Sequence, residues 1–141
     1  MKYAYCSKRL FVVVFVLLVI AACKKENLAK NFTGSYTGTA IEKLQPDLSV
    51  VKTYTNCKIV ISEVDRKKIK LTITRDPSDP SSQFYAESTV QDANHFKDFH
   101  GGQRAQSTSY EGSLQSRELI FKMETNFMGS VYQFQFQGLR D

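Results

Sequence analysis

The thiol of Cys57 and the imidazoles of His95 and His100 are the side chains whose types could support covalent chemistry. A cysteine becomes a strong nucleophile when a neighbouring histidine acts as its base. However, Cys57 alternates with Ile59 and Ile61, which places its sulfur on the apolar face of a strand. A buried thiol in apolar surroundings is inert. We therefore predict no catalytic residue and a protein that is not an enzyme.

His95, Asp98 and His100 form a second group of candidate functional residues, because imidazole and carboxylate groups are ligands of zinc. Three such residues close to a pair of glycines are also typical of a polar surface loop. Asp76 and Asp79 lack the further oxygen ligands of a calcium loop. We therefore predict no metal site and no cofactor.

The N-terminal segment determines which part of the chain must position these groups. An apolar run covers residues 10–22 and follows three basic residues, Lys2, Lys8 and Arg9. Thirteen residues make a helix of about 20 Å, whereas the hydrocarbon core of a bilayer is roughly 30 Å thick. A short apolar core behind a basic start, ending in small residues, is the pattern of a secretory signal peptide.

The end of this segment reads Ile20-Ala21-Ala22-Cys23 and resembles the lipobox of bacterial lipoproteins. The resemblance implies that Cys23 receives a diacylglycerol and becomes the first mature residue. We therefore expect a signal peptide over 1–22 and a lipidated tether over 23–30. Two or more acyl chains anchor a protein stably, so the partner of Cys23 would be a membrane. Ordinary secretion with cleavage nearby is the alternative.

The tether is polar and would span at most about 25 Å when extended. In enteric lipoproteins an Asp after the acylated cysteine favours the inner membrane, and Lys24 stands at that position here. The resemblance therefore implies a cell-envelope protein in the outer membrane, facing the periplasm.

Removal of the signal peptide changes the charge and the cysteine count. The formal net charge falls from +5 to +2 without the three basic residues, so the charge gives no reason to expect nucleic-acid binding. Cys57 would be the one remaining free thiol, and no internal disulfide could form. The remaining length suffices for one modest core, and we expect a monomer.

From residue 31 the chain consists of short runs in which apolar and polar residues alternate. The run 68–74 alternates cleanly, with Ile69, Leu71 and Ile73 between polar residues, and the clearest run is the last one, 131–137. Alternation with period two is typical of a strand with one buried face. We predict strands over 31–41, 50–64, 68–74, 84–90, 94–99, 110–114, 119–123 and 131–137, and no helix in this part of the chain.

The fold class expected from these runs is all-β over residues 31–141. About eight consecutive strands with hairpin-length connections indicate an antiparallel meander. Closing the meander into a barrel removes its exposed edges, and an open sandwich is the alternative.

Two sequence features resemble the lipocalins, a calycin-type family of barrels. Lipocalins begin their first strand with Gly-x-Trp and place an Arg over the Trp from the end of the last strand. Gly34-Ser35-Tyr36 and Arg140 occupy the matching positions here. The resemblance implies a compact lipocalin-like barrel with a ligand-binding mouth.

Alternation also predicts which residues face the barrel interior. An eight-stranded barrel is either filled by side chains or holds one small ligand. The predicted inward residues are Tyr36, Ile59, Ile61, Ile69, Leu71, Ile73, Phe84, Tyr110, Leu114, Phe121, Met123, Tyr132, Phe134 and Phe136. Those predicted to contact a ligand are Tyr36, Tyr110, Phe121, Tyr132 and Phe134.

We therefore expect a lipid-anchored binding protein that holds a small apolar or amphipathic ligand in the mouth of the barrel. The alternative is a filled barrel that binds a protein, as an envelope hydrolase inhibitor or an assembly accessory, through loops 42–49, 76–82 and 100–106. A basic cluster at a predicted turn could touch anionic head groups, or simply be solvated. It comprises Arg66, Lys67, Lys68 and Lys70.

Overall fold

The structure is a computed structural model that describes residues 26–44, 49–101 and 106–141. The predicted signal peptide and the predicted lipidation site, Cys23, lie outside these residues. Within the described part of the chain, no helix is both long enough and apolar enough to span a bilayer.

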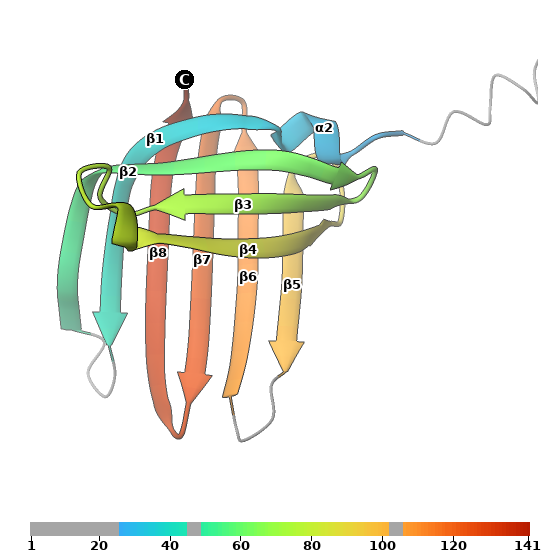
Figure 1. The fold of residues 1–141 in the computed structure, drawn as a ribbon. Coiled ribbons are helices and arrows are strands. Elements are labelled where there is room, and N and C mark those ends of the chain that lie inside the picture. Colours follow the sequence, from blue (N-terminus) through green and yellow to red (C-terminus); the bar gives the residue numbers. More distant parts are fainter. Residues whose placement is uncertain (1–25, 45–48, 102–105) are drawn as a thin grey trace, which may run out of the picture.

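Eight antiparallel strands follow one another around a closed barrel (Figure 1). Their order along the chain is their order in the sheet, and β1 closes the barrel by pairing with both β2 and β8. The predicted all-β meander and its closure are therefore confirmed. The strands are β1 (Gly34–Leu44), β2 (Ser49–Asp65), β3 (Lys68–Thr74), β4 (Gln83–Val90), β5 (His95–Gly101), β6 (Gln106–Gln115), β7 (Glu118–Phe127) and β8 (Ser130–Arg140).

Two short helices were not predicted. The helix α2 (Ala29–Phe32) occupies the start of the first predicted strand, and the 3-10 turn η1 (Pro80–Ser82) precedes β4. Ala29 and Phe32 lie three residues apart, so they share one face of α2, and both are fully buried. The segment predicted as a tether therefore packs against the barrel from Leu28 onward.

The strands form two parts that cross each other. In Figure 1, β3 and β4 run across β5–β8, which extend past them toward one end. The two parts meet between β4 and β5 at the pairs Thr89–Lys97 and Val90–Phe96, whereas β3 and β4 pair along all of β3. We call the end covered by α2 the helix end, and the end with the β1–β2 and β7–β8 hairpins the mouth.

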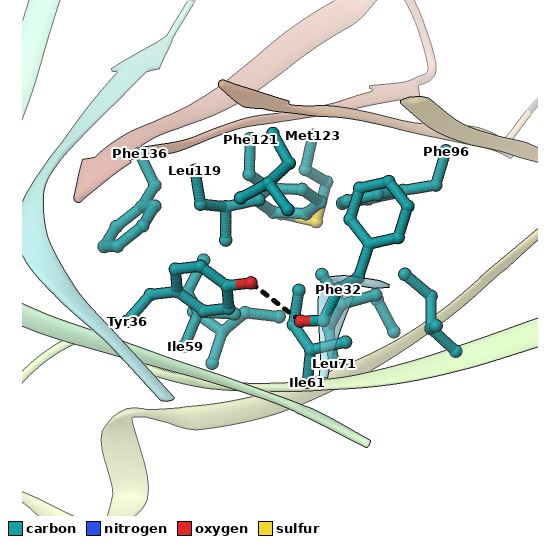
Figure 2. Close-up of a cluster of buried hydrophobic side chains, with 14 of the residues drawn as sticks. Phe32, Tyr36, Ile59, Ile61, Leu71, Phe96, Leu119, Phe121, Met123 and Phe136 are labelled. Atoms are coloured by element: carbon teal, nitrogen blue, oxygen red, sulfur yellow. Dashed lines mark hydrogen bonds between the residues drawn. The ribbon is translucent and has the colours of Figure 1, made fainter. Parts of the chain in front are cut away.

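The helix end is closed by side chains. The Phe32 ring packs edge-on against Phe96, with centroids 5.3 Å apart, and the Tyr36 hydroxyl donates to the carbonyl oxygen of Phe32 at 2.7 Å (Figure 2). Arg140 donates from Nη2 to the Tyr36 hydroxyl and to the carbonyl oxygen of Asn31. The predicted contact between Arg140 and the first-strand aromatic is therefore present.

The predicted inward face is confirmed in the described residues. Eleven of the fourteen predicted side chains are buried, and Phe84, Tyr110 and Tyr132 are partly buried against the same cluster. The core also contains aromatic and aliphatic side chains that were not assigned to it: Phe32, Phe96 and Leu119.

Candidate functional site

A buried carboxylate at the mouth gathers three donors from three other segments. Glu42, at the end of β1, is 8% exposed. Its Oε1 accepts hydrogen bonds from the Tyr132 hydroxyl at 2.6 Å and from Arg75 Nη1 at 2.9 Å. Its Oε2 accepts from the Tyr54 hydroxyl at 3.1 Å. We call Glu42, Tyr54, Arg75 and Tyr132 the mouth cluster.

Strand geometry explains how these residues converge. Glu42 lies six residues after Tyr36 in β1, so it faces inward like Tyr36. Arg75 follows β3 and continues the inward series of Ile69, Leu71 and Ile73. Tyr132 lies on β8, which pairs with the end of β1.

The mouth cluster lies on an aromatic floor. The rings of Phe84 on β4 and Phe134 on β8 meet edge to face with centroids 5.5 Å apart. Because β4 and β8 are on opposite sides of the barrel, this contact bridges the interior. The Arg75 guanidinium lies 5.5 Å above the Phe84 ring, a cation–π arrangement.

Electrostatics in the mouth cluster favour an ionised Glu42. Burial by itself would raise the pKa of Glu42, but the hydrogen bonds from Tyr132, Arg75 and Tyr54 outweigh it and hold the pKa below its usual value. Burial and the same carboxylate raise the pKa of both tyrosines, so their hydroxyls stay protonated and act as donors. The cluster is thus a charged pair with two neutral donors.

A polar cleft of about 400 Å³ lies beside the mouth cluster, between β2 and the turn after β3. Lys52 and Arg75 give it two cations, and Asp76 gives it one carboxylate. Lys52 Nζ lies 4.7 Å from the centroid of the Tyr54 ring. The Asp76 carboxylate accepts from the Ser78 backbone and hydroxyl, which lower its pKa. Lys52 and the exposed part of Arg75 are the groups of this cleft that favour an anionic ligand.

The structure brings Phe121 and Phe134 together, with ring centroids 6.3 Å apart, but it does not gather all five predicted ligand-contacting residues at one place. Tyr132 is half-buried at the mouth, and Tyr110 is half-buried on β6 in the same register row as Phe134, which is buried in the floor. Phe121 is buried in the core. Tyr36 is fully buried at the helix end, where its hydroxyl is engaged by Phe32 and Arg140.

Cys57 is fully buried, as its alternation predicted. Burial raises the pKa of the thiol to about 12, so the thiolate is scarce near neutral pH. This environment does not activate a nucleophile.

The candidate metal ligands His95, Asp98 and His100 all lie on β5, but each has a different partner. His95 pairs with Asp92 at 3.0 Å on the outside of the barrel. Asp98 accepts from Thr89, and the His100 ring packs edge-on against Tyr110. Within the described residues no group of three His, Cys, Asp or Glu side chains is arranged to hold a metal ion.

Comparison with known proteins supports the fold. No protein family model matches the sequence, and no curated protein matches it. A solved structure described as a "putative outer membrane protein" from Bacteroides fragilis is similar, with a TM-score of 0.58 and 14% sequence identity. The match covers 81% of this chain and 53% of that one, so this chain spans about half of the other's length. At this identity the similarity establishes a shared β-barrel fold.

Glu42 and Arg75 were not among the residues singled out from the sequence. The available signal was alternation, since both continue inward-facing series by steps of two. Tyr54 offered no such signal because a register shift between Gly38 and Ala40 interrupts the pairing of β1 with β2.

Proposed function

We propose that this chain is a lipid-anchored protein of the bacterial cell envelope that binds, and does not transform, an amphipathic molecule at the mouth of its barrel. The lipobox-like sequence ending at Cys23 supports the anchor. The description of the Bacteroides protein supports an outer-membrane location.

The mouth cluster and the adjoining cleft are the observation that carries this proposal. The contact between Phe84 and Phe134 spans the barrel beneath the mouth cluster, which favours a ligand that lies outside the core. Its apolar part would lie over the half-buried rings of Tyr110 and Tyr132. Its anionic group would meet Lys52 and the exposed side of Arg75, whose side chain is 30% exposed.

Native mass spectrometry of the full chain purified from envelopes tests this proposal, with dodecyl phosphate and dodecanol added as probes. We expect a retained adduct with dodecyl phosphate and a weaker one with dodecanol. Lys52→Gln removes one exposed charge and should weaken the phosphate adduct by about fivefold, or about 1 kcal/mol. Lys122→Gln, on the outer wall of β7, is the matched control and should leave it unchanged. Equal retention of both probes by all variants would contradict the anionic site.

A second function, binding of a protein, is favoured by exposed apolar side chains on the hairpins at the mouth. Phe127 and Met128 are 51% and 75% exposed. The β1–β2 hairpin adds Leu44, Val50 and Val51. Of the loops predicted to bind a partner, residues 45–48 and 102–105 lie outside the described residues, and residues 76–78 of the third loop border the cleft. A protein that copurifies in place of a small molecule would favour this second function.

A further inference from the structure

The start of the described chain is fixed to the turn between β2 and β3. The backbone N–H of Ala29 donates to the carbonyl oxygen of Arg66 at 3.1 Å, and the Asn27 side chain donates to Glu63 Oε1 at 2.8 Å. Glu26 and Leu28 border a cleft whose other side is Asp65, Arg66 and Lys67. The chain therefore leaves the barrel alongside this turn.

This position limits the distance between the turn and the proposed anchor. Two residues separate Glu26 from Cys23, so the Cα atoms of Glu26 and Cys23 lie at most about 11 Å apart. If Cys23 carries the lipid, Glu26 is held close to the head groups, and the turn that lines the same cleft is held near them as well. The mouth is at the other end of β8, whose 11 residues extend for about 35 Å.

The side chains of this turn suit an anionic surface. Arg66, Lys67 and Lys68 are exposed, and within the described residues none has an ion-pair partner. The neighbouring carboxylates are Glu26, Glu63 and Asp65. Glu63 accepts from Asn27, and Asp65 accepts from the Lys67 backbone at 2.8 Å. Both carboxylates are thus engaged within the protein, and the basic side chains are long enough to extend past them to a neighbouring surface.

We infer that the β2–β3 turn rests on the anionic head groups of the membrane that holds Cys23, with Arg66, Lys67 and Lys68 on lipid phosphates and the mouth pointing away from the bilayer. This inference rests on the proposed lipid anchor. It adds to that proposal the orientation of the barrel and the surface that faces the membrane.

Spin labels at the two ends of β2 test the orientation. Val64→Cys and Val50→Cys are matched variants, since the two valines are 53% and 58% exposed near opposite ends of one strand. Cys57 is buried and stays protonated, so it should not compete for the label. The full acylated chain is placed in vesicles of phosphatidylethanolamine with or without phosphatidylglycerol. We expect the label at 64, but not at 50, to be protected from an aqueous relaxation agent by several-fold.

The role of the basic residues is tested by Arg66→Gln, Lys67→Gln and Lys68→Gln combined in the Val64→Cys chain. In anionic vesicles each lost charge should reduce the population in contact with the membrane by about fivefold. The control replaces Lys43, Lys97 and Lys122 by Gln and should change nothing.

The outcomes separate the inference from the proposal on which it rests. Intact mass first reports whether Cys23 is acylated. An acylated chain with equal accessibility at 64 and 50 overturns the orientation alone. A chain that keeps Met1 and carries no acyl group overturns the anchor and this orientation together.

Discussion

The two ends of the barrel differ in the kinds of side chains that close them. At the helix end, aromatic rings and α2 close the interior, and the hydroxyl of Tyr36 is hydrogen-bonded within the protein. At the mouth, an ion pair and two tyrosine hydroxyls lie on the core, and apolar side chains are left exposed on the hairpins. Apolar packing dominates the helix end, so this end should contribute most to the free energy of unfolding. Electrostatic interactions dominate the mouth, which should be available for binding.

Removal of an aromatic ring tests this difference with the largest expected effect. Phe96→Ala removes a fully buried ring that contacts Phe32 and Phe121. We expect it to lower the free energy of unfolding by about 4 kcal/mol, measured by urea denaturation. Phe127→Ala removes the same ring at the mouth, where it is 51% exposed, and should cost below about 1 kcal/mol. Similar losses for the two variants would contradict the division between the ends.

Gly112 lies against the Phe96 ring and offers a second test of packing at the helix end. A Cβ added at Gly112 would lie 2.0 Å from Phe96 Cζ, so Gly112→Ala should destabilise the protein by about 1–3 kcal/mol. In the Phe96→Ala background the added methyl group would occupy the space left by the ring. The two losses should therefore be strongly non-additive in a double-mutant cycle. Additive losses would mean that Phe96 does not lie over Gly112.

The helix end also shows where sequence patterns suffice and where they do not. Alternation predicted the eight strands and most of the core because the side chains of a strand point alternately to its two faces. It did not predict α2, because four residues are too few to show a helical period and the helix forms where Phe32 packs on Phe96. Phe96 itself was missed because the surrounding polar residues obscured the apolar face of β5.

At the mouth, Glu42→Gln tests the contribution of the charged pair. The variant keeps the shape of the side chain but leaves Arg75 without a charged partner, and we expect a loss of about 2 kcal/mol near neutral pH. The pKa of Glu42 is lower in the folded state than its ordinary value. The carboxylate therefore contributes stability above its unfolded-state pKa, and this contribution is lost as the pH falls through the folded-state pKa.

Urea denaturation across pH measures this dependence. The stabilities of wild type and Glu42→Gln should converge in acid and separate toward neutral pH. Glu124→Gln is the control, since Glu124 pairs with Lys122 on the surface and is 39% exposed. We expect it to change stability by under about 1 kcal/mol. A constant difference between wild type and Glu42→Gln at every pH would contradict the role of the charge.

The mouth cluster was harder to predict than the core for a physical reason. A charged residue at an inward position is usually a sign that the strand has ended, because burial of an unpaired charge is costly. Glu42 is buried because partners from β2, β8 and the turn after β3 converge on it. That convergence depends on barrel closure and on the register shift between β1 and β2, neither of which a single run of residues encodes.

The smallest effect is expected at the tip of the β7–β8 hairpin. Met128 and Gly129 form its two-residue turn with φ of 51° and 85°, the arrangement in which Asn-Gly is preferred. Met128→Asn should raise the free energy of unfolding by about 0.5–1 kcal/mol, because asparagine tolerates this conformation better than methionine. Met128→Leu keeps an apolar side chain in the same conformation and should leave stability unchanged. A loss of stability in Met128→Asn would mean that the methionine side chain packs against the barrel. A gain would mean that methionine is unfavourable for the stability of this turn. The chain would then keep a 75% exposed apolar residue where a ligand or partner can reach it.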